Sequence, residues 1–270
     1  MTDPVAAVAE ADATGEAAAI FADIRAVYRV GVVNLVWRHL ATLPGALPLV
    51  WNLVRPAYVD GSVAREATAL RARLVLPDLP ALPDHVFAAA GLSMSDVSAI
   101  RDVLSAYDRT NAMALLALTA ARRHLAGVPP PPALAPAPSP AETPAVALPA
   151  LPSLSDLAPD VATLVLALNQ LGANRAQPML ASMYRHLAYW PPVLALSWTV
   201  LAPIRDLAKV TESTMATAQH QAGRLHLVGP IPSSAQANEI DAAIARFTDD
   251  PILRMTTICT ILARTMGAAA

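Results

Sequence analysis

A 23-residue segment of this chain occurs twice, and this repeat limits the folds that the chain can adopt. The first copy, Asn34–Pro56, reads NLVWRHLATLPGALPLVWNLVRP, and the second, Ala181–Pro203, reads ASMYRHLAYWPPVLALSWTVLAP. They align without a gap at an offset of 147 residues, and nine of the 23 positions are identical. Two copies are too few for a solenoid, so we predict a pseudo-dimer, two similar halves packed about an approximate two-fold axis.

Both halves are predicted to be helical. Hydrophobic residues recur at helical spacing, and no stretch shows the alternation that is typical of a strand. Pro44-Gly45 and Pro191-Pro192 are strong stop signals, and they are predicted to end the helices Val30–Leu43 and Ala176–Tyr189. The fold class is therefore predicted to be all-α.

The last two helices of each half are also expected to correspond. In the first half they are Val97–Ala106 and Thr110–Ala126, and in the second they are Ser234–Phe247 and Ile252–Met266. Setting Tyr107 on Phe247 places Asn111 on Pro251, and both segments then run to a glycine at the same distance.

A proline-rich segment divides the chain. It spans residues 128–152 and holds ten prolines, so it is predicted to be an extended, polyproline-like linker. The alternative is a ligand for a proline-recognition module. Residues 1–127 are predicted to form the first helical repeat and residues 153–270 the second, while the Ala-rich, acidic residues 1–16 are predicted to be loose at first.

Composition excludes several classes of protein. The chain is 55% hydrophobic and only 15% charged, against about 25% in typical proteins, so much of it must be buried. Its net charge is −2 and it has no block of basic residues, which makes nucleic acid an unsuitable partner. The longest apolar run, His186–Ile204, contains three prolines, so we expect no membrane-spanning helix. The acidic N-terminus is not a secretory signal and the single cysteine excludes an internal disulfide, so we expect a cytoplasmic protein.

The motifs that usually identify an enzyme or a metal site are absent from the sequence. There is no GxGxxG, GxxxxGK[ST], HExxH, CxxC or GxSxG, and the six histidines form no spaced ligand set with carboxylates. We therefore expect no cofactor and no metal.

Three segments together resemble one family. They are FADIRAVYRVGVVNLVWRHLATLPGALPLVW (Phe21–Trp51), AYDRTNAMALLALTAA (Ala106–Ala121) and YRHLAYWPPVLALSWTVLAPI (Tyr184–Ile204). The chain resembles the group I, DehI-type 2-haloacid dehalogenases over nearly its whole length. The resemblance implies an all-α pseudo-dimer with one pocket between the halves, in which an aspartate activates a water that displaces halide from C2 of a short acid without a covalent ester intermediate.

The resemblance assigns pocket positions one by one. The family's pocket asparagine falls on Asn111, and the serine before the catalytic aspartate falls on Ser182. The catalytic aspartate itself falls on Met183, where this sequence departs from the family pattern. The pocket tryptophan and phenylalanine fall near Val32 and Leu35, and Phe247 is expected to line the pocket.

Further candidate site residues come from the chemistry of their side chains, and each has a structural alternative. Asn111 is expected to orient the substrate, or else to cap a helix Ala112–Ala126. Asp108 is a candidate base, or else a solvated turn carboxylate. His186 lies three residues after Met183 and is a candidate base near pH 7, although its Arg-His dipeptide recurs in both halves, which favours a structural role.

Two other candidates break the repeat. Arg254 has Ala114 as its counterpart and could bind sulfate or carboxylate. Asn34 has Ala181 as its counterpart and could add a polar group to the pocket. Met183 could instead be ordinary core packing, and Cys259 is expected to be an inert buried thiol.

Three functions remain open at this point, all with a small-molecule substrate. The favoured one is an enzyme of substitution at saturated carbon in which an amine of the substrate attacks, sulfate leaves and an aziridine closes, as in azabicyclic natural-product pathways. The second is a hydrolytic 2-haloacid dehalogenase whose base has moved to His186 or Asp108. The third is a non-catalytic partner of an active homologue. A homodimer or a heterodimer with a paralogue is expected.

Overall fold

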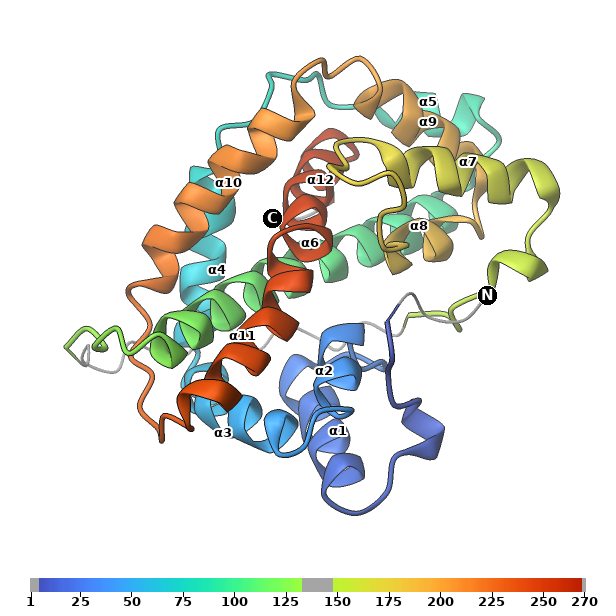
Figure 1. Ribbon diagram of the computed structural model, residues 1–270. Helices are drawn as coiled ribbons and strands as arrows, with labels where there is room; N and C mark the ends of the chain where they lie inside the picture. Colours follow the sequence, from blue (N-terminus) through green and yellow to red (C-terminus); the bar gives the residue numbers. More distant parts are fainter. Residues whose placement is uncertain (1–4, 133–147, 269–270) are drawn as a thin grey trace.

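The chain folds as a set of α-helices without β-strands in the part that the computed structural model describes, residues 5–132 and 148–268. This confirms the all-α prediction (Figure 1). The described helices are α1 (Gly15–Tyr28), α2 (Leu35–Leu40), α3 (Ala46–Val59), α4 (Ser62–Arg73), α5 (Asp84–Ala89), α6 (Met94–Leu125), α7 (Pro159–Gln170), α8 (Ser182–Leu187), α9 (Pro191–Leu201), α10 (Leu207–Ala222), α11 (Ser234–Thr248) and α12 (Pro251–Thr265), with short 3-10 turns at Glu10–Asp12 and Leu154–Asp156.

The long helix α6 runs through the middle of the molecule, and α12 packs against it (Figure 1). α6 has 32 residues and begins with a capping box, in which the Ser93 side chain accepts from the backbone N–H of Asp96 and the Asp96 carboxylate accepts from the backbone N–H of Ser93. Its residues from Asn111 to Ala121 are all buried, so α6 is a core element rather than a surface helix.

The sequence prediction of two helices in this region was wrong. We expected a break between Ala106 and Thr110, but α6 continues through it without interruption. The reason is that residues 107–109 contain no glycine or proline, and Asp108 pairs with Arg71 while Arg109 donates to the Tyr28 carbonyl, so neither side chain marks an exposed turn.

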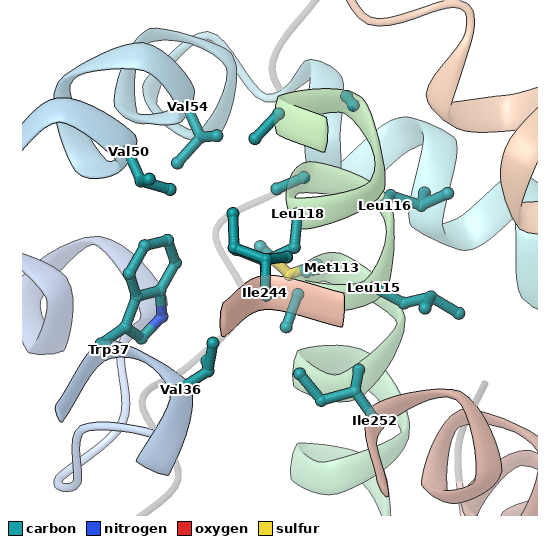
Figure 2. Close-up of a cluster of buried hydrophobic side chains, with 14 of the residues drawn as sticks. Val36, Trp37, Val50, Val54, Met113, Leu115, Leu116, Leu118, Ile244 and Ile252 are labelled. Carbon is teal, nitrogen blue, oxygen red and sulfur yellow. The ribbon is translucent and has the colours of Figure 1, made fainter. Parts of the chain in front are cut away.

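Two hydrophobic cores are present, and each draws on both halves of the sequence. The first core joins α1–α4 and the C-terminal part of α6 to α10 and α11. Figure 2 shows Ile244 of α11 between Trp37 and Val50 of the N-terminal helices and Leu118 of α6. The second core joins α5 and the N-terminal part of α6 to α7–α9 and α12. Helices from the two halves of the sequence therefore pack together in both cores.

Corresponding helices of the two halves are separated along the chain by the offsets that the sequence repeats predict. α2 and α8 are 147 residues apart at both ends, and the span of α6, Met94 to Leu125, is 140 residues from the span of α11 and α12, Ser234 to Thr265. The difference is that Pro251 starts a new helix where α6 has Asn111. The division into repeats at residues 1–127 and 153–270 stays a prediction.

The Arg-His pair of each copy ties down the chain segment that precedes it. Arg38 Nε donates to the Val8 carbonyl at 2.9 Å, and His39 Nδ1 bonds to the Ala6 carbonyl at 2.7 Å. The segment 5–13 is therefore held in place, where the sequence suggested a loose start. The Glu10 carboxylate reinforces it by accepting from Arg25 at 2.6 Å.

The second Arg-His pair holds the end of the predicted linker in the same way. Arg185 Nε donates to the Pro152 carbonyl at 2.7 Å, and Nε2 of His186 lies 3.0 Å from the Pro149 carbonyl. The linker ends 128–132 and 148–152 are without regular secondary structure, and its middle, residues 133–147, lies outside the described residues.

Two predicted helices are shorter than expected. α2 begins at Leu35 rather than at Val30, because the chain leaves α1 through Arg29 in a left-handed conformation (φ 54°). α8 begins at Ser182 rather than at Ala176, since Pro178 and the loop before it precede the helix. None of the described helices is both long and apolar enough to cross a membrane.

Candidate functional site

Three predicted residues meet between α6, α8 and α12. Asn111 Nδ2 donates to the Cys259 sulfur at 3.5 Å, and the Cys259 thiol donates to the Met183 sulfur at 3.3 Å. Met183 and Cys259 are fully buried and Asn111 is 9% exposed. Asn111 lies in the middle of α6, so the alternative that it caps a helix was wrong.

Cys259 is held in its neutral form. Burial raises the pKa of its thiol well above the ordinary value, the Asp108 carboxylate nearby raises it further, and the bond from Asn111 acts in the opposite direction. A neutral thiol is neither a strong nucleophile nor a metal ligand. The atoms of the Asn111, Cys259 and Met183 cluster therefore supply no base.

Asp108 lies next to this cluster and is committed to two strong bonds. One carboxylate oxygen accepts from Nη1 of Arg71 at 2.7 Å, and the other accepts from the Thr260 hydroxyl at 2.6 Å. The Asp108 side chain is 3% exposed, so the alternative of a solvated turn carboxylate was wrong. Its role as a base stays a prediction, and a base in this position would first have to release Arg71 or Thr260.

His186 belongs to a second polar chain, which starts beside Met183. Its Nδ1 lies 2.7 Å from the Tyr107 hydroxyl, and the Ser182 hydroxyl interacts with the same tyrosine. Since the carbonyl of Pro149 can only accept, Nε2 carries the proton and Nδ1 accepts from Tyr107. Ser182, Tyr107 and His186 thus form a continuous path of hydroxyl groups that ends at an imidazole lone pair.

The imidazole of His186 is uncharged at neutral pH. Burial lowers its pKa below the ordinary 6.5, and the Arg185 charge lowers it further, although the bond to Pro149 opposes both effects. Burial also raises the pKa of Tyr107. The neutral imidazole can accept a proton through Tyr107, whereas a water molecule has no direct access to its nitrogens.

Arg254 is bonded to residues outside the Asn111 cluster. Its side chain is 1% exposed, Nη1 donates to the Asn169 carbonyl at 2.8 Å, and Nε lies 3.4 Å from the Asp250 carboxylate. Its Nη2 and the nearby Tyr184 hydroxyl are buried without a hydrogen-bond partner. Binding of sulfate or carboxylate by Arg254 stays a prediction.

Three of the remaining predicted pocket residues lie in the first half and the fourth, Phe247, lies in α11. Val32 lies between α1 and α2 and is 37% exposed, Asn34 precedes α2 without capping it, and Leu35, the first residue of α2, is half-buried. Phe247 is buried with its ring 5.5 Å from that of His39. No contact joins these four residues to the Asn111 cluster among those that the described structure defines, so their pocket role stays a prediction.

The sequence interpretation missed Tyr107, Arg71 and Thr260. A signal for Tyr107 was present, because it lies four residues before Asn111 and so on the same face of α6. The charged residues Arg65, Glu66, Arg71 and Arg73 indicate an outer helix face, which gave no reason to expect a buried partner for Arg71, and Thr260 carried no signal. Within residues 5–132 and 148–268, no three His, Cys, Asp or Glu side chains are grouped to hold a metal ion.

Comparisons with known proteins point to one group. Over 124 residues, 44% of this chain, the sequence is 35% identical to a configuration-inverting 2-haloacid dehalogenase of Alcaligenes xylosoxydans xylosoxydans, and the match covers 42% of that relative. No family model matches.

Solved structures match over the whole chain. A D-2-haloacid dehalogenase in complex with L-LA has a TM-score of 0.73 and covers 100% of this chain and 99% of its own, at 18% identity. A mutant D-2-haloacid dehalogenase with D-2-CPA has a TM-score of 0.71, with 99% and 97% covered, also at 18% identity. The chain therefore has the all-helical fold of the D-2-haloacid dehalogenases.

Proposed function

We propose that this chain is a divergent member of the 2-haloacid dehalogenase group that catalyses substitution at a saturated carbon of a small substrate. In the favoured form, an amine of the substrate attacks, sulfate leaves and an aziridine closes. The observation that carries this proposal is the cluster of Asn111, Cys259 and Met183, where the sequence resemblance places a catalytic aspartate on Met183. A thioether cannot take a proton from water, so the cluster lacks the group that would make water the nucleophile.

The proposed reaction balances as follows. The substrate ammonium loses a proton, its nitrogen lone pair forms a bond to the carbon that carries the sulfate ester, and the C–O bond breaks with its electron pair leaving on sulfate. Ser182, Tyr107 and His186 offer a path for the proton, because the neutral imidazole accepts at Nδ1. Asn111 would hold the substrate in the bent conformation that back-side attack requires.

A second candidate function is hydrolysis of a 2-haloacid with a relocated base. The same path from Ser182 through Tyr107 to His186 favours it, since a water molecule at Ser182 could lose its proton along this path. Asp108 is the weaker candidate for the base, because both of its oxygens are occupied.

A paired turnover assay tests the proposal. The purified protein, alone and with a co-expressed paralogue, is given 2-chloropropionate, read as halide release, and an amino acid with a sulfate ester two carbons from its amine, read as sulfate release and by the mass of the product. The favoured form predicts a cyclised product. Halide release together with a hydroxy acid would establish the hydrolytic function instead, and dependence on the paralogue would assign the chain to a shared assembly.

Two variants make the assay specific for the site. Asn111→Ala removes the amide beside Cys259, and we expect it to lower turnover about a hundredfold, in line with the loss of a positioning hydrogen bond. Asn52→Ala removes an exposed amide from α3 and should leave turnover unchanged. Equal turnover of Asn111→Ala and the wild type would exclude this cluster as the site.

A further inference from the structure

Three arginine side chains gather on the side of α6 that faces α1 and α4. Arg109 of α6 donates from Nη1 to the carbonyl of Tyr28 at 3.3 Å, which places it at the end of α1, beside Arg29. Arg71 of α4 reaches the same region, since it binds the neighbour of Arg109, Asp108, at 2.7 Å. Arg29 and Arg109 are half-buried and the Arg71 side chain is 12% exposed, so the group lies between the interior and the surface.

Two of these guanidinium groups have donors to spare. Arg71 uses Nη1 for Asp108 and Nη2 for Thr68, but its Nε is buried without a hydrogen-bond partner. Arg109 uses Nη1 for Tyr28 and for the sulfur of Met113, but its Nη2 is also buried without a partner. A buried N–H that lacks an acceptor costs free energy, and two such donors on cations call for an anionic acceptor.

The two arginines with unpaired donors differ in their partners. Arg71 is bonded to the Asp108 carboxylate, which also accepts from Thr260, whereas the bonds of Arg109 go to a carbonyl and a thioether. The pKa of Arg109 is lowered, first by burial and then by the charges of Arg71 and Arg29. Like charges that are held close together disfavour the charged form, and an anion bound to Arg109 and Arg71 would reduce this repulsion.

The arginine group also adjoins the candidate site. Asp108 and Asn111 lie on one face of α6, three residues apart, and they contact consecutive residues of α12, Thr260 and Cys259. An anion bound to Arg109 and Arg71 would therefore lie beside Asp108 of α6, whose α12 partner Thr260 follows Cys259 of the Asn111 cluster.

We propose that Arg109 and Arg71, with Arg29 beside them, bind an oxyanion, either the carboxylate or the sulfate group of the substrate. The planar fork of guanidinium donors matches both groups, and the two unpaired N–H groups supply the bonds. This inference deepens the proposed function, because it names the residues that would hold the anionic end of the substrate.

Anion binding is measured without turnover. Calorimetric titration at constant ionic strength, set with chloride, uses 2-chloropropionate in one arm and inorganic sulfate in the other. We expect the wild type to bind at least one of them, and Arg109→Gln to weaken that binding by about tenfold to a hundredfold, as the loss of a charge-assisted hydrogen bond implies. Arg246→Gln removes an exposed arginine from α11 and should bind like the wild type. The arm that responds identifies the anion class.

Two results would overturn the inference: a wild type that binds neither anion, or an Arg109→Gln variant that binds as tightly as the wild type. If Arg109→Gln does not fold by circular dichroism, Arg109→Lys takes its place, since it keeps the charge but loses the fork, and binding should weaken about tenfold. A wild type that binds an anion but turns over no substrate refutes the proposed function and leaves this inference standing. If Arg109→Gln turns over substrate as fast as the wild type, the anion site is refuted and the proposed function stands.

Discussion

Replacing Asp108 by asparagine tests how the interior around α6 is held together. Asparagine keeps the shape and can still accept from Thr260, but it removes the negative charge that Arg71 faces at 2.7 Å. The two side chains are 3% and 12% exposed, so water can compensate little of the loss. Breaking a buried pair by removing one partner costs about 3–5 kcal/mol, and we expect Asp108→Asn to lose that much stability.

Two neighbours of Asp108 change the size of this loss of stability in opposite directions. Arg71 would keep Arg109 as a like-charged neighbour without the carboxylate that pairs with it, which adds to the cost. The retained bond to Thr260 reduces it, since a neutral hydrogen bond contributes about 1 kcal/mol. On balance the thermal midpoint should fall by on the order of 10 °C.

Urea unfolding followed by circular dichroism measures this effect. Asp102→Asn is the matched control, because Asp102 lies on the same helix and is exposed, and its change should stay within about 0.5 kcal/mol. The double variant with Arg71→Met should be less destabilised than the sum of the single changes. An Asp108→Asn protein as stable as the wild type would refute the assignment of Asp108 to a structural ion pair and would return it to the candidate bases.

Three further predictions concern other parts of the chain. Because Cys259 is fully buried and burial raises the pKa of its thiol, a thiol reagent should modify the native protein at least about a hundredfold more slowly than the urea-unfolded chain; equal rates would contradict this. Burial lowers the pKa of His186, so as pH falls below about 6.5 the unfolded chain takes up a proton at this residue and the folded chain does not. The free energy of unfolding should therefore decrease from about pH 7.5 to about pH 5.5. In urea titrations, His186→Gln should show a weaker dependence on pH, and an unchanged dependence would contradict this. Gly45→Ala should lose about 1 kcal/mol, since Gly45 has φ 71° ahead of α3, while Gly31→Ala, in open space without a positive φ, should change thermal stability by less than about 0.5 kcal/mol.

Much of the helical architecture was predictable because it depends on local signals. Pro44-Gly45 lies in the turn between α2 and α3, and Pro191 begins α9 after the turn that follows α8, as such residues indicate. The periodic apolar residues of α3 and α12 indicate faces that must be buried. The course of α6 through Asp108 was not predictable, because local reasoning treats a charged pair as exposed. The partners of Asp108 are Arg71 and Thr260, which lie 37 and 152 residues away along the chain.

Part of the candidate site was predictable from the sequence, and part of it depends on contacts between distant residues. The resemblance identified Asn111 and Met183, and the structure brings both to Cys259, which the sequence interpretation expected only to be buried and inert. The bond between Tyr107 and His186 joins residues 79 positions apart and depends on how α8 packs against α6. Such a pair has no signature in a single sequence, so the proton path and the arginine group required the structure.

The most direct test of the central claim, that water is not the nucleophile, is turnover in water enriched in heavy oxygen. The protein is incubated in this isotope-labelled water with the amino sulfate ester or with 2-chloropropionate, and the mass of the organic product is measured by mass spectrometry. The account predicts a cyclised product from the sulfate ester that carries no heavy oxygen. A hydroxy acid from either substrate that carries heavy oxygen at the carbon of substitution would show that water attacks, and it would contradict the interpretation of Met183.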